Sequence, residues 1–305
     1  MHLLLCNAHL PDPAYARALD ALALPHLRSL AHRLQWQPAQ PLPGSVYGAA
    51  HEPLLATLLG LPWHDGHWPA TGLETSRLEP CGWLSPCHWE IGERHMVLHD
   101  PAQLQLDDTE SRALCASIAP LLLDDALELG YQAPERWLLR GALVADLRCA
   151  ALERVIGQPV HDWLAQGPTA QRWRTLQAEI EMLLYTHPVN EARNALGKVS
   201  VNAVWLHGAG SLAALPSARP CPEIDQTLGA PLRSRDMQAW LAAWRHLDDG
   251  VLARLNAAAR AGAPVRLTLC GEHAARTFGP TQARGGARLL QRIRPQRPSN
   301  LLSAL

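Results

Sequence analysis

The stretch HPVNEARNALGKVSVNAVWLHGAG, residues 187–210, holds the features that decide the fold. It opens with a proline and an asparagine that can turn the chain, and a short helical segment and a glycine-containing loop follow. The apolar run SVNAVWLHGAG (200–210) then predicts a strand that leads into a glycine-rich turn. The loop carries Lys198, the only lysine of the chain. The stretch therefore predicts a helix and a strand with polar side chains gathered between them.

Four polar side chains of this stretch form a candidate binding site: His187, Asn190, Arg193 and Lys198. Guanidinium and ammonium groups beside a helix end and a glycine turn suit a phosphate or a carboxylate, because they donate charge-assisted hydrogen bonds. The same letters also fit a structural interpretation, in which HPVN stops a helix and turns the chain. An anion-binding site and a helix stop both remain open at this point.

The rest of the chain alternates between strand and helix patterns. Apolar runs at 2–6 and 264–273 predict buried strands, whereas 14–33 and 235–261 have the periodicity of helices. Alternation of this kind favours an α/β fold with a mostly parallel sheet. Ligands of such folds bind beyond the carboxyl ends of the strands. We therefore expect a rim formed by Asn7, Gly208–Gly210 and Gly271–His273.

The composition limits the class of protein. Hydrophobic residues make up 48% of the chain and the net charge is -1, which favours a sizeable core and weighs against nucleic acid as the main partner. No apolar run approaches the roughly 20 residues of a transmembrane helix, so no membrane partner is expected. The seven cysteines are scattered and form no CxxC pair. This pattern predicts no disulfide framework and a cytoplasmic location.

Two further groups of residues have two interpretations each. The segment WHDGHW (63–68), with Cys81, Cys87-His88, His95 and His99 downstream, could hold a soft metal ion, or it could be a polar loop packed over tryptophans. The chain has 11 Trp and a single Phe, which suits either a Trp-lined ligand pocket or tryptophan as core. The tail, 281–305, contains several arginines that could touch an acidic partner, although we expect it to be solvated.

The opening stretch resembles the loop-and-strand signature of archaeal-type cofactor-independent phosphoglycerate mutases, which belong to the alkaline phosphatase superfamily. HPVNEARNALGK and VNAVWLHGAG keep the order and spacing of that signature. Weaker similarity runs in order through MHLLLCNAHLPDP, AHEPLLATLLGLPWHDG, PCHWEIGERHMVLHD and PVRLTLCGEHAA, with a deletion between about 211 and 240. The resemblance implies a three-layer core at 1–74 and 200–280 and a small inserted α+β domain at 75–199, followed by the tail 281–305.

The departures from this family fall on its chemistry. The family transfers a phosphoryl group with two metal ions and a serine nucleophile, and the metals require carboxylates and imidazoles. Asn7 stands where the resemblance places a metal-binding aspartate, and His51 stands where it places the serine. Glu272 and His273 take the place of an Asp-His metal pair. They are the candidate ligands for one ion such as Mn or Zn, although we expect no bound metal.

The chain is also similar to bacterial RpfE-type regulatory proteins, which share the HPVN, VNAVWL and CHWEIG-like elements. We therefore expect a catalytically degenerate relative of phosphoglycerate mutase with a regulatory or binding role. Its partner would be a small anionic ligand or a protein. Two alternatives stay open. One is a metal-dependent phosphotransferase or phosphohydrolase in which His51 accepts the phosphoryl group. The other is a His/Cys metal-binding protein.

Overall fold

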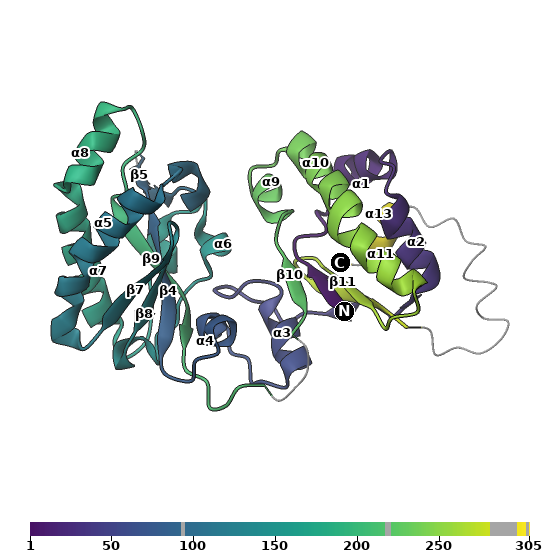
Figure 1. The fold of residues 1–305 in the computed structure, drawn as a ribbon, viewed down its shortest axis with the longest axis horizontal. Helices are drawn as coiled ribbons and strands as arrows, with labels where there is room; N and C mark the ends of the chain where they lie inside the picture. The colour runs from purple at the N-terminus through teal and green to yellow at the C-terminus, as the bar shows by residue number, and fades with distance from the viewer. Residues whose placement is uncertain (93–94, 217–220, 281–297, 303–304) are drawn as a thin grey trace. The chain divides into compact units, whose positions relative to one another are not determined.

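The computed structural model describes residues 1–92, 95–216, 221–280, 298–302 and 305. The chain forms two compact units, each with its own sheet and hydrophobic core (Figure 1). Unit 1 comprises Met1–Gly44, Ala50–Leu61 and Ala218–Leu305, and unit 2 comprises Ser45–Ala49 and Pro62–Ser217.

Unit 1 is built on a mixed sheet. Its strand order is β10 (Glu223–Asp225), β1 (His2–Leu5), β11 (Arg266–Cys270), β12 (Ala274–Gly279) and β2 (Gln35–Trp36), and β3 (Gln40–Pro41) also pairs with β12. β1 runs parallel to β10 and β11, whereas β12 is antiparallel to all its neighbours. The prediction of a mostly parallel sheet is therefore right for β10, β1 and β11 and wrong for the rest. The reason is the tight turn between β11 and β12, because a chain that reverses in two residues must pair antiparallel.

Helices pack on one face of this sheet (Figure 1). Leu3 and Leu5 of β1 point to the same face, as alternate residues of a strand do, and they share a core with Leu267 and Leu269. The helices of unit 1 are α1 (Pro13–Asp20), α2 (Pro25–Arg33), α3 (Glu52–Leu59), α9 (Gly229–Arg233), α10 (Met237–Leu247), α11 (Ala253–Arg260) and α13 (Pro298–Leu302), with a π-helical turn at Asp248–Leu252.

The region 14–33, predicted as one helix, is divided into α1 and α2. Pro25 stands at the first position of α2, where its missing N–H costs nothing, and it prevents the preceding residues from continuing α1. The cap of α2 comes from a distant residue: the Asp248 carboxylate accepts hydrogen bonds from the N–H groups of His26 (3.1 Å) and Leu27 (2.7 Å). Burial raises the pKa of Asp248. The long helix predicted at 235–261 is confirmed, with the π-helical turn inside it.

The C-terminal residues are not a solvated tail where the structure describes them. Residues 281–297 lie outside the described part of the chain, whereas Leu301 and Leu302 of α13 are buried at 4% and 3% exposure. Asp20 accepts hydrogen bonds from the N–H (3.0 Å) and hydroxyl (2.7 Å) of Ser299. Arg276 donates to the carbonyl of Leu301 (2.9 Å) at the other end of the helix. Both helix ends are thus fastened to unit 1.

Unit 2 is built on an antiparallel sheet in the order β7 (Glu128–Ala133), β8 (Arg136–Arg140), β4 (Cys81–Cys87) and β9 (Ala203–Gly210), with a separate hairpin of β5 (Trp89–Ile91) and β6 (Met96–Leu98). Its helices are α4 (Ala70–Thr75), α5 (Asp108–Ile118), α6 (Leu152–Val155), α7 (Ala170–Tyr185) and α8 (Pro188–Ala195), with 3-10 turns at Pro101–Leu104, Ala119–Asp125, Ala142–Val144 and Val160–Trp163. Leu84, Trp137 and Leu206 share a core with residues of α5 and α7. The N-terminus of α5 is a capping box of Asp107 and Glu110, as its sequence predicts.

The strand that ends the opening stretch lies in unit 2. β9 pairs along its length with β4, so residues 203–210 share a sheet with 81–87. The sequence predicts this strand as part of the core segment 200–280. The structure places the strand in unit 2, because antiparallel pairing with β4 commits its whole length to the unit 2 sheet.

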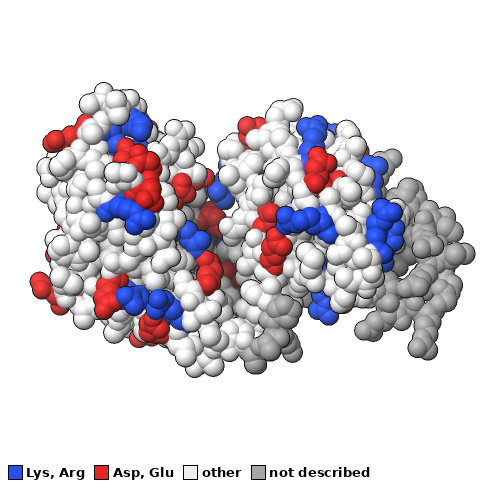
Figure 2. Space-filling view, viewed as in Figure 1, with Lys and Arg blue, Asp and Glu red and all other residues white. Residues whose placement is uncertain are grey.

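The surface of each unit carries both signs of charge. Figure 2 shows acidic and basic side chains interspersed in small groups on the face it presents. Among the described residues, no helix has both the length and the apolar character needed to cross a bilayer.

Candidate functional site

The four predicted anion-binding residues do come together, around α8. His187 caps the start of this helix: its Nδ1 accepts the N–H of Val189 at 3.2 Å, and Pro188 occupies the first turn. Because Nδ1 accepts, the neutral ring carries its hydrogen on Nε2, which donates to the Ser117 hydroxyl at 2.9 Å. Burial lowers the pKa of His187. This imidazole therefore joins the start of α8 to α5.

Asn190 is buried, and its amide binds backbone groups alone. Its Nδ2 donates to the carbonyls of Leu184 (2.8 Å) and Val201 (2.7 Å), and its Oδ1 accepts the N–H of Val201 (2.8 Å). These bonds join the end of α7 to the segment that leads into β9. The asparagine thus acts as a bridge between two stretches of main chain that no sheet or helix connects.

Arg193 is fully buried and supplies the strongest part of this arrangement. Its guanidinium donates to the carbonyls of Val199 (2.8 Å) and Leu104 (2.5 Å) and to the Glu110 carboxylate (2.5 Å). Lys198 is exposed, and its Nζ lies 3.7 Å from the other oxygen of Glu110. Glu110 thus stands where an anion would bind these two cations.

We name His187, Asn190, Arg193 and Glu110 the α8 clamp. Its polar groups bind main chain, one another, or the neighbouring side chains of Ser117 and Lys198, so its geometry is that of a structural fastening. α7 ends at Tyr185 and α8 begins at Pro188, which agrees with HPVN as a helix stop.

The segment beyond the clamp holds the β5–β6 hairpin. Asn202 accepts the N–H of Trp89 (2.7 Å) and donates to its carbonyl (2.9 Å). The Nδ1 of His88 lies 2.9 Å from the carbonyl oxygen of Ser200. Side chains and main chain of the VSVN segment therefore fix the first strand of the hairpin.

The thiols of the predicted His/Cys metal site are poorly placed for a metal. Cys81 and Cys87 are fully buried in β4, and burial raises the pKa of both. A metal ligand must be a thiolate, which this environment disfavours. Over the part of the chain that the structure describes, no group of three or more His, Cys, Asp or Glu residues could hold a metal ion.

The WHDGHW segment is a structural loop centred on Asp65. Its carboxylate accepts the N–H groups of Tyr47 (2.9 Å) and Gly48 (2.7 Å) and pairs with Arg148 at 2.5 Å. Burial acts to raise the pKa of Asp65, but these partners outweigh it and the pKa is lowered. The segment thus ties residues 45–48 to unit 2.

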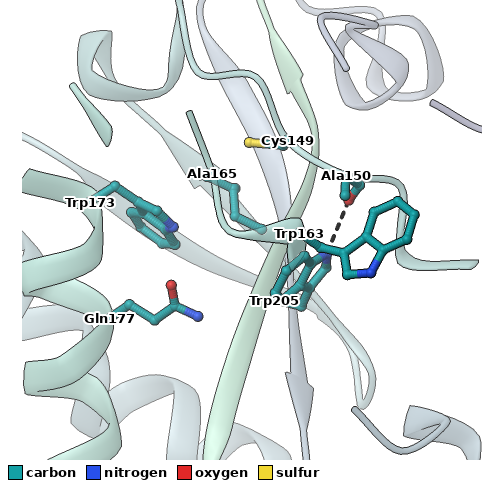
Figure 3. Close-up of a pocket in the computed structure, with 8 residues that line it drawn as sticks. Cys149, Ala150, Trp163, Ala165, Trp173, Gln177 and Trp205 are labelled. Carbon is teal, nitrogen blue, oxygen red and sulfur yellow. Dashed lines mark hydrogen bonds between the residues drawn. The ribbon is translucent and has the colours of Figure 1, made fainter. Parts of the chain in front are cut away.

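Three tryptophans of unit 2 line a small cavity (Figure 3). Trp163, Trp173 and Trp205 surround it, together with Gln177 and Cys149. The indole N–H of Trp205 donates to the carbonyl of Ala150 at 3.0 Å. The space open to the centre of a water molecule is about 10 Å³, which is close to the minimum for one bound water. Here tryptophan serves as core and leaves no room for a larger ligand.

The carboxyl ends of the parallel strands in unit 1 form the second polar region. Main-chain bonds join them: the N–H of Cys6 donates to Asp225 and the N–H of Ala8 to Cys270, each at 2.9 Å. Asn7, between these two, takes the left-handed conformation with φ 55°. Asparagine tolerates this conformation better than most residues, because its short polar side chain can bond locally.

Gly229 and Arg233 of α9 complete this region. A Cβ on Gly229 would lie 3.0 Å from both Asn7 Nδ2 and Arg233 Nη1. Two nitrogen donors therefore converge on the bare face of this glycine. We name Asn7, Gly229 and Arg233 the strand-end rim. The sequence resemblance does not point to Gly229 and Arg233, because it places a deletion there, although the EID strand (223–225) before them is a usable signal.

The other predicted catalytic and metal residues also lie in unit 1, on separate elements. His51 directly precedes α3 and is 7% exposed. Glu272 and His273 are the exposed residues of the β11–β12 turn, which is closed by a 2.9 Å bond from Gly271 N–H to the Ala274 carbonyl. The rim thus brings an amide and a guanidinium together, and Glu272 and His273 stand on a separate turn.

Comparison with known proteins gives a distant relationship. No family model matches the chain. It is 30% identical over 106 residues to the 2,3-bisphosphoglycerate-independent phosphoglycerate mutase of Methanothrix thermoacetophila, covering 34% of this chain and 26% of that protein. The corresponding Methanosarcina barkeri protein is 24% identical over 156 residues, covering 50% and 38%. The chain thus spans well under half the length of the curated relatives it matches.

Among solved structures, the cofactor-independent phosphoglycerate mutase of Thermoplasma acidophilum is similar to this chain at 14% identity and a TM-score of 0.39. The alignment covers 100% of this chain and 98% of the Thermoplasma chain. The sequence matches, at low identity, show that this mixed α/β chain is a distant homologue of the archaeal-type cofactor-independent phosphoglycerate mutases.

Proposed function

We propose that this protein is a catalytically degenerate phosphoglycerate-mutase-like protein, which binds a phosphorylated small molecule and acts as a regulator. The observation that carries the proposal is the strand-end rim. Asn7 stands at the end of β1, where the resemblance places a metal-binding carboxylate, and Arg233 Nη1 lies beside it, close to Gly229.

The chemistry of these donors supports binding over transfer. A phosphoryl transferase of this class needs cations that neutralise the phosphate and activate a nucleophile. Carboxylates and imidazoles hold such cations, whereas an amide N–H and a guanidinium bind the anion directly. Phosphate would then be held at the rim without the groups that make it react.

In this proposal unit 1, whose helices pack on one face of its sheet, corresponds to the alkaline-phosphatase-like core and unit 2 to the inserted domain. The similarity to RpfE-type regulatory proteins supports a regulatory rather than a metabolic role. A regulatory role requires a protein partner, and we propose such a partner as well.

The alternative keeps an enzymatic function. His51 immediately precedes α3, a position that suits a nucleophile, and a histidine can accept a phosphoryl group. Glu272 and His273 would then hold one metal ion from the β11–β12 turn.

Two measurements on the full chain without an affinity tag separate these functions. Isothermal titration with 3-phosphoglycerate and with inorganic phosphate tests binding, and turnover of 3-phosphoglycerate with added Mn²⁺ or Zn²⁺ tests catalysis. We expect binding without turnover, and affinity at least roughly tenfold weaker in Arg233→Ala, which loses a charge-assisted contact. Arg260→Ala, an exposed arginine on α11, is the matched control and should bind like the wild type.

Turnover that disappears in His51→Ala or Glu272→Ala would establish the enzyme and reject the proposal. If the protein bound neither 3-phosphoglycerate nor inorganic phosphate, the proposal of a phosphorylated ligand would be rejected. Binding that Arg233→Ala leaves unchanged would remove the strand-end rim from the site.

A further inference from the structure

Two histidines face each other at the base of the β5–β6 hairpin in unit 2. His88 precedes β5 and His99 follows β6, and the N–H of His99 donates to the carbonyl of His88 at 2.9 Å. Their ring centroids are 5.5 Å apart, with the planes inclined at 68°. The pair therefore occupies facing positions across an antiparallel ladder, where side chains meet.

The hydrogen bonds of the pair fix which ring nitrogens remain available. The Ser200 carbonyl can only accept, so His88 Nδ1 carries the hydrogen at 2.9 Å and Nε2 keeps its lone pair. The Glu90 carboxylate lies 2.6 Å from His99 Nε2, so the neutral ring donates there and Nδ1 keeps its lone pair. Each imidazole thus donates from one nitrogen to an oxygen and offers the other, as metal-binding histidines in proteins do.

The α8 clamp holds the first of these rings in place. Ser200 and Asn202 belong to the segment that Asn190 fastens at Val201, and Asn202 binds both main-chain groups of Trp89, the residue after His88. His99 is reachable from solvent, with 34% of its side chain exposed. A preorganised ring beside an accessible one suits capture of an ion from solution.

We propose that His88 and His99 bind one Zn²⁺ or Cu²⁺ ion, with water completing the coordination and Glu90 as the hydrogen-bonding partner of His99. Two imidazoles on one tetrahedral ion have their ring centres about 5 Å apart, given metal–nitrogen bonds of about 2 Å, and this separation is close to the 5.5 Å of the pair. Imidazole selects these ions over Mg²⁺ and Mn²⁺. This site is separate from the strand-end rim and does not depend on the proposed phosphate binding.

The test is titration of metal-free, untagged full-length protein with Zn²⁺ by calorimetry, and with Cu²⁺ by electron paramagnetic resonance. We expect about one ion per chain and a Cu²⁺ spectrum with hyperfine splitting from nitrogen ligands. His88→Ala and His99→Ala should each weaken Zn²⁺ binding at least tenfold, and Glu90→Gln roughly tenfold through the loss of the partner of His99. His246→Ala, an exposed histidine on α10, should bind like the wild type.

A thermal melt of each variant without metal keeps the result interpretable, because His88 also binds Ser200. If His88→Ala melts early, His99→Gln takes its place, since it removes the ligand and keeps an amide donor for Glu90. Zn²⁺ binding that survives in the double variant His88→Ala/His99→Ala would overturn the proposal, as would no binding at millimolar Zn²⁺. Metal lost in Glu272→Ala, but retained in His88→Ala and His99→Ala, would assign the ion to unit 1 instead.

Discussion

The α8 clamp of unit 2 and the strand-end rim of unit 1 contain the same kinds of side chain, asparagine and arginine, in opposite settings. Asn190 and Arg193 are buried and bind carbonyls, an N–H and a carboxylate of the protein. Asn7 and Arg233 lie half-buried at the ends of parallel strands, with their nitrogens converging beside a glycine. The first arrangement binds main chain within the core of its unit, and the second lies at strand ends, where ligands of α/β folds bind.

The comparison shows that the most distinctive motif of a sequence can belong to its scaffold. A buried polar group costs free energy unless it is hydrogen-bonded, so a polar cluster in a folded chain must be specific in its partners. The polar side chains of the HPVN…R segment find their hydrogen-bonding partners within the protein. These partners restrict which residue types fit there, and no ligand is needed to explain the motif.

The largest effect is expected for Arg193→Met. The substitution keeps the bulk of the side chain but leaves Glu110 and the carbonyls of Leu104 and Val199 without their donor. Breaking a buried ion pair from one side costs about 3–5 kcal/mol of unfolding free energy. Urea denaturation followed by circular dichroism measures it. Arg112→Met on α5, whose ion pair with Asp108 is exposed, is the control and should change little. A small loss for Arg193→Met would mean that the clamp is not structural.

Asn190→Ala should have the next largest effect. It removes hydrogen bonds to Leu184 and Val201 and leaves the buried N–H and carbonyl of Val201 without the partner they have in Asn190, whereas the Leu184 carbonyl keeps the N–H of His187 at 3.2 Å. The expected loss is about 2–3 kcal/mol in the same denaturation experiment. Asn194→Ala, an exposed asparagine on the same helix, supplies the reference. Equal stability of the two variants would contradict the bridging role of Asn190.

A smaller effect is expected in the way the stability of the protein depends on pH, through His187 of the α8 clamp. Burial lowers the pKa of His187 in the folded chain from its ordinary 6.5. The unfolded chain therefore binds the proton first, and stability is lost as the pH falls below 6.5 and through the lower folded value. His187→Asn keeps a capping oxygen but does not titrate. Denaturation at pH 7.5 and 5 should show a smaller acid loss in the variant than in the wild type. An identical pH dependence of both proteins would show that His187 does not contribute.

The smallest effect is expected at the rim, for Asn7→Gly. Glycine adopts the left-handed φ of this position without steric cost, and over the described residues the Asn7 side chain has no hydrogen bond to lose. Stability should stay within about 0.5 kcal/mol of the wild type, whereas phosphate affinity should fall if Asn7 Nδ2 is a ligand donor. Asn7→Ala should cost more, about 1–2 kcal/mol, because alanine resists that backbone conformation. A large loss for the glycine variant would make Asn7 as structural as Asn190.

Local pattern was sufficient for much of the secondary structure. Gly60 ends α3 in a left-handed conformation, Asp107 and Glu110 start α5, and the apolar runs at 2–6 and 264–273 contain strands. These features depend on a few neighbouring residues, such as those that cap the unpaired main-chain groups at a helix end. Their signals therefore lie in the sequence itself.

The sequence by itself thus determined the start and end of many elements, the distant homology and the grouping of the HPVN…R…K side chains. Only the tertiary structure decided what those side chains bind. Glu110, 83 residues from Arg193 along the chain, takes the place of the anion that the motif predicted. Pairing of β9 with β4 moved its glycines to unit 2, and the hairpin set His88 opposite His99. Such contacts join residues far apart in the chain, and their identity depends on which surfaces pack together, which local spacing does not encode.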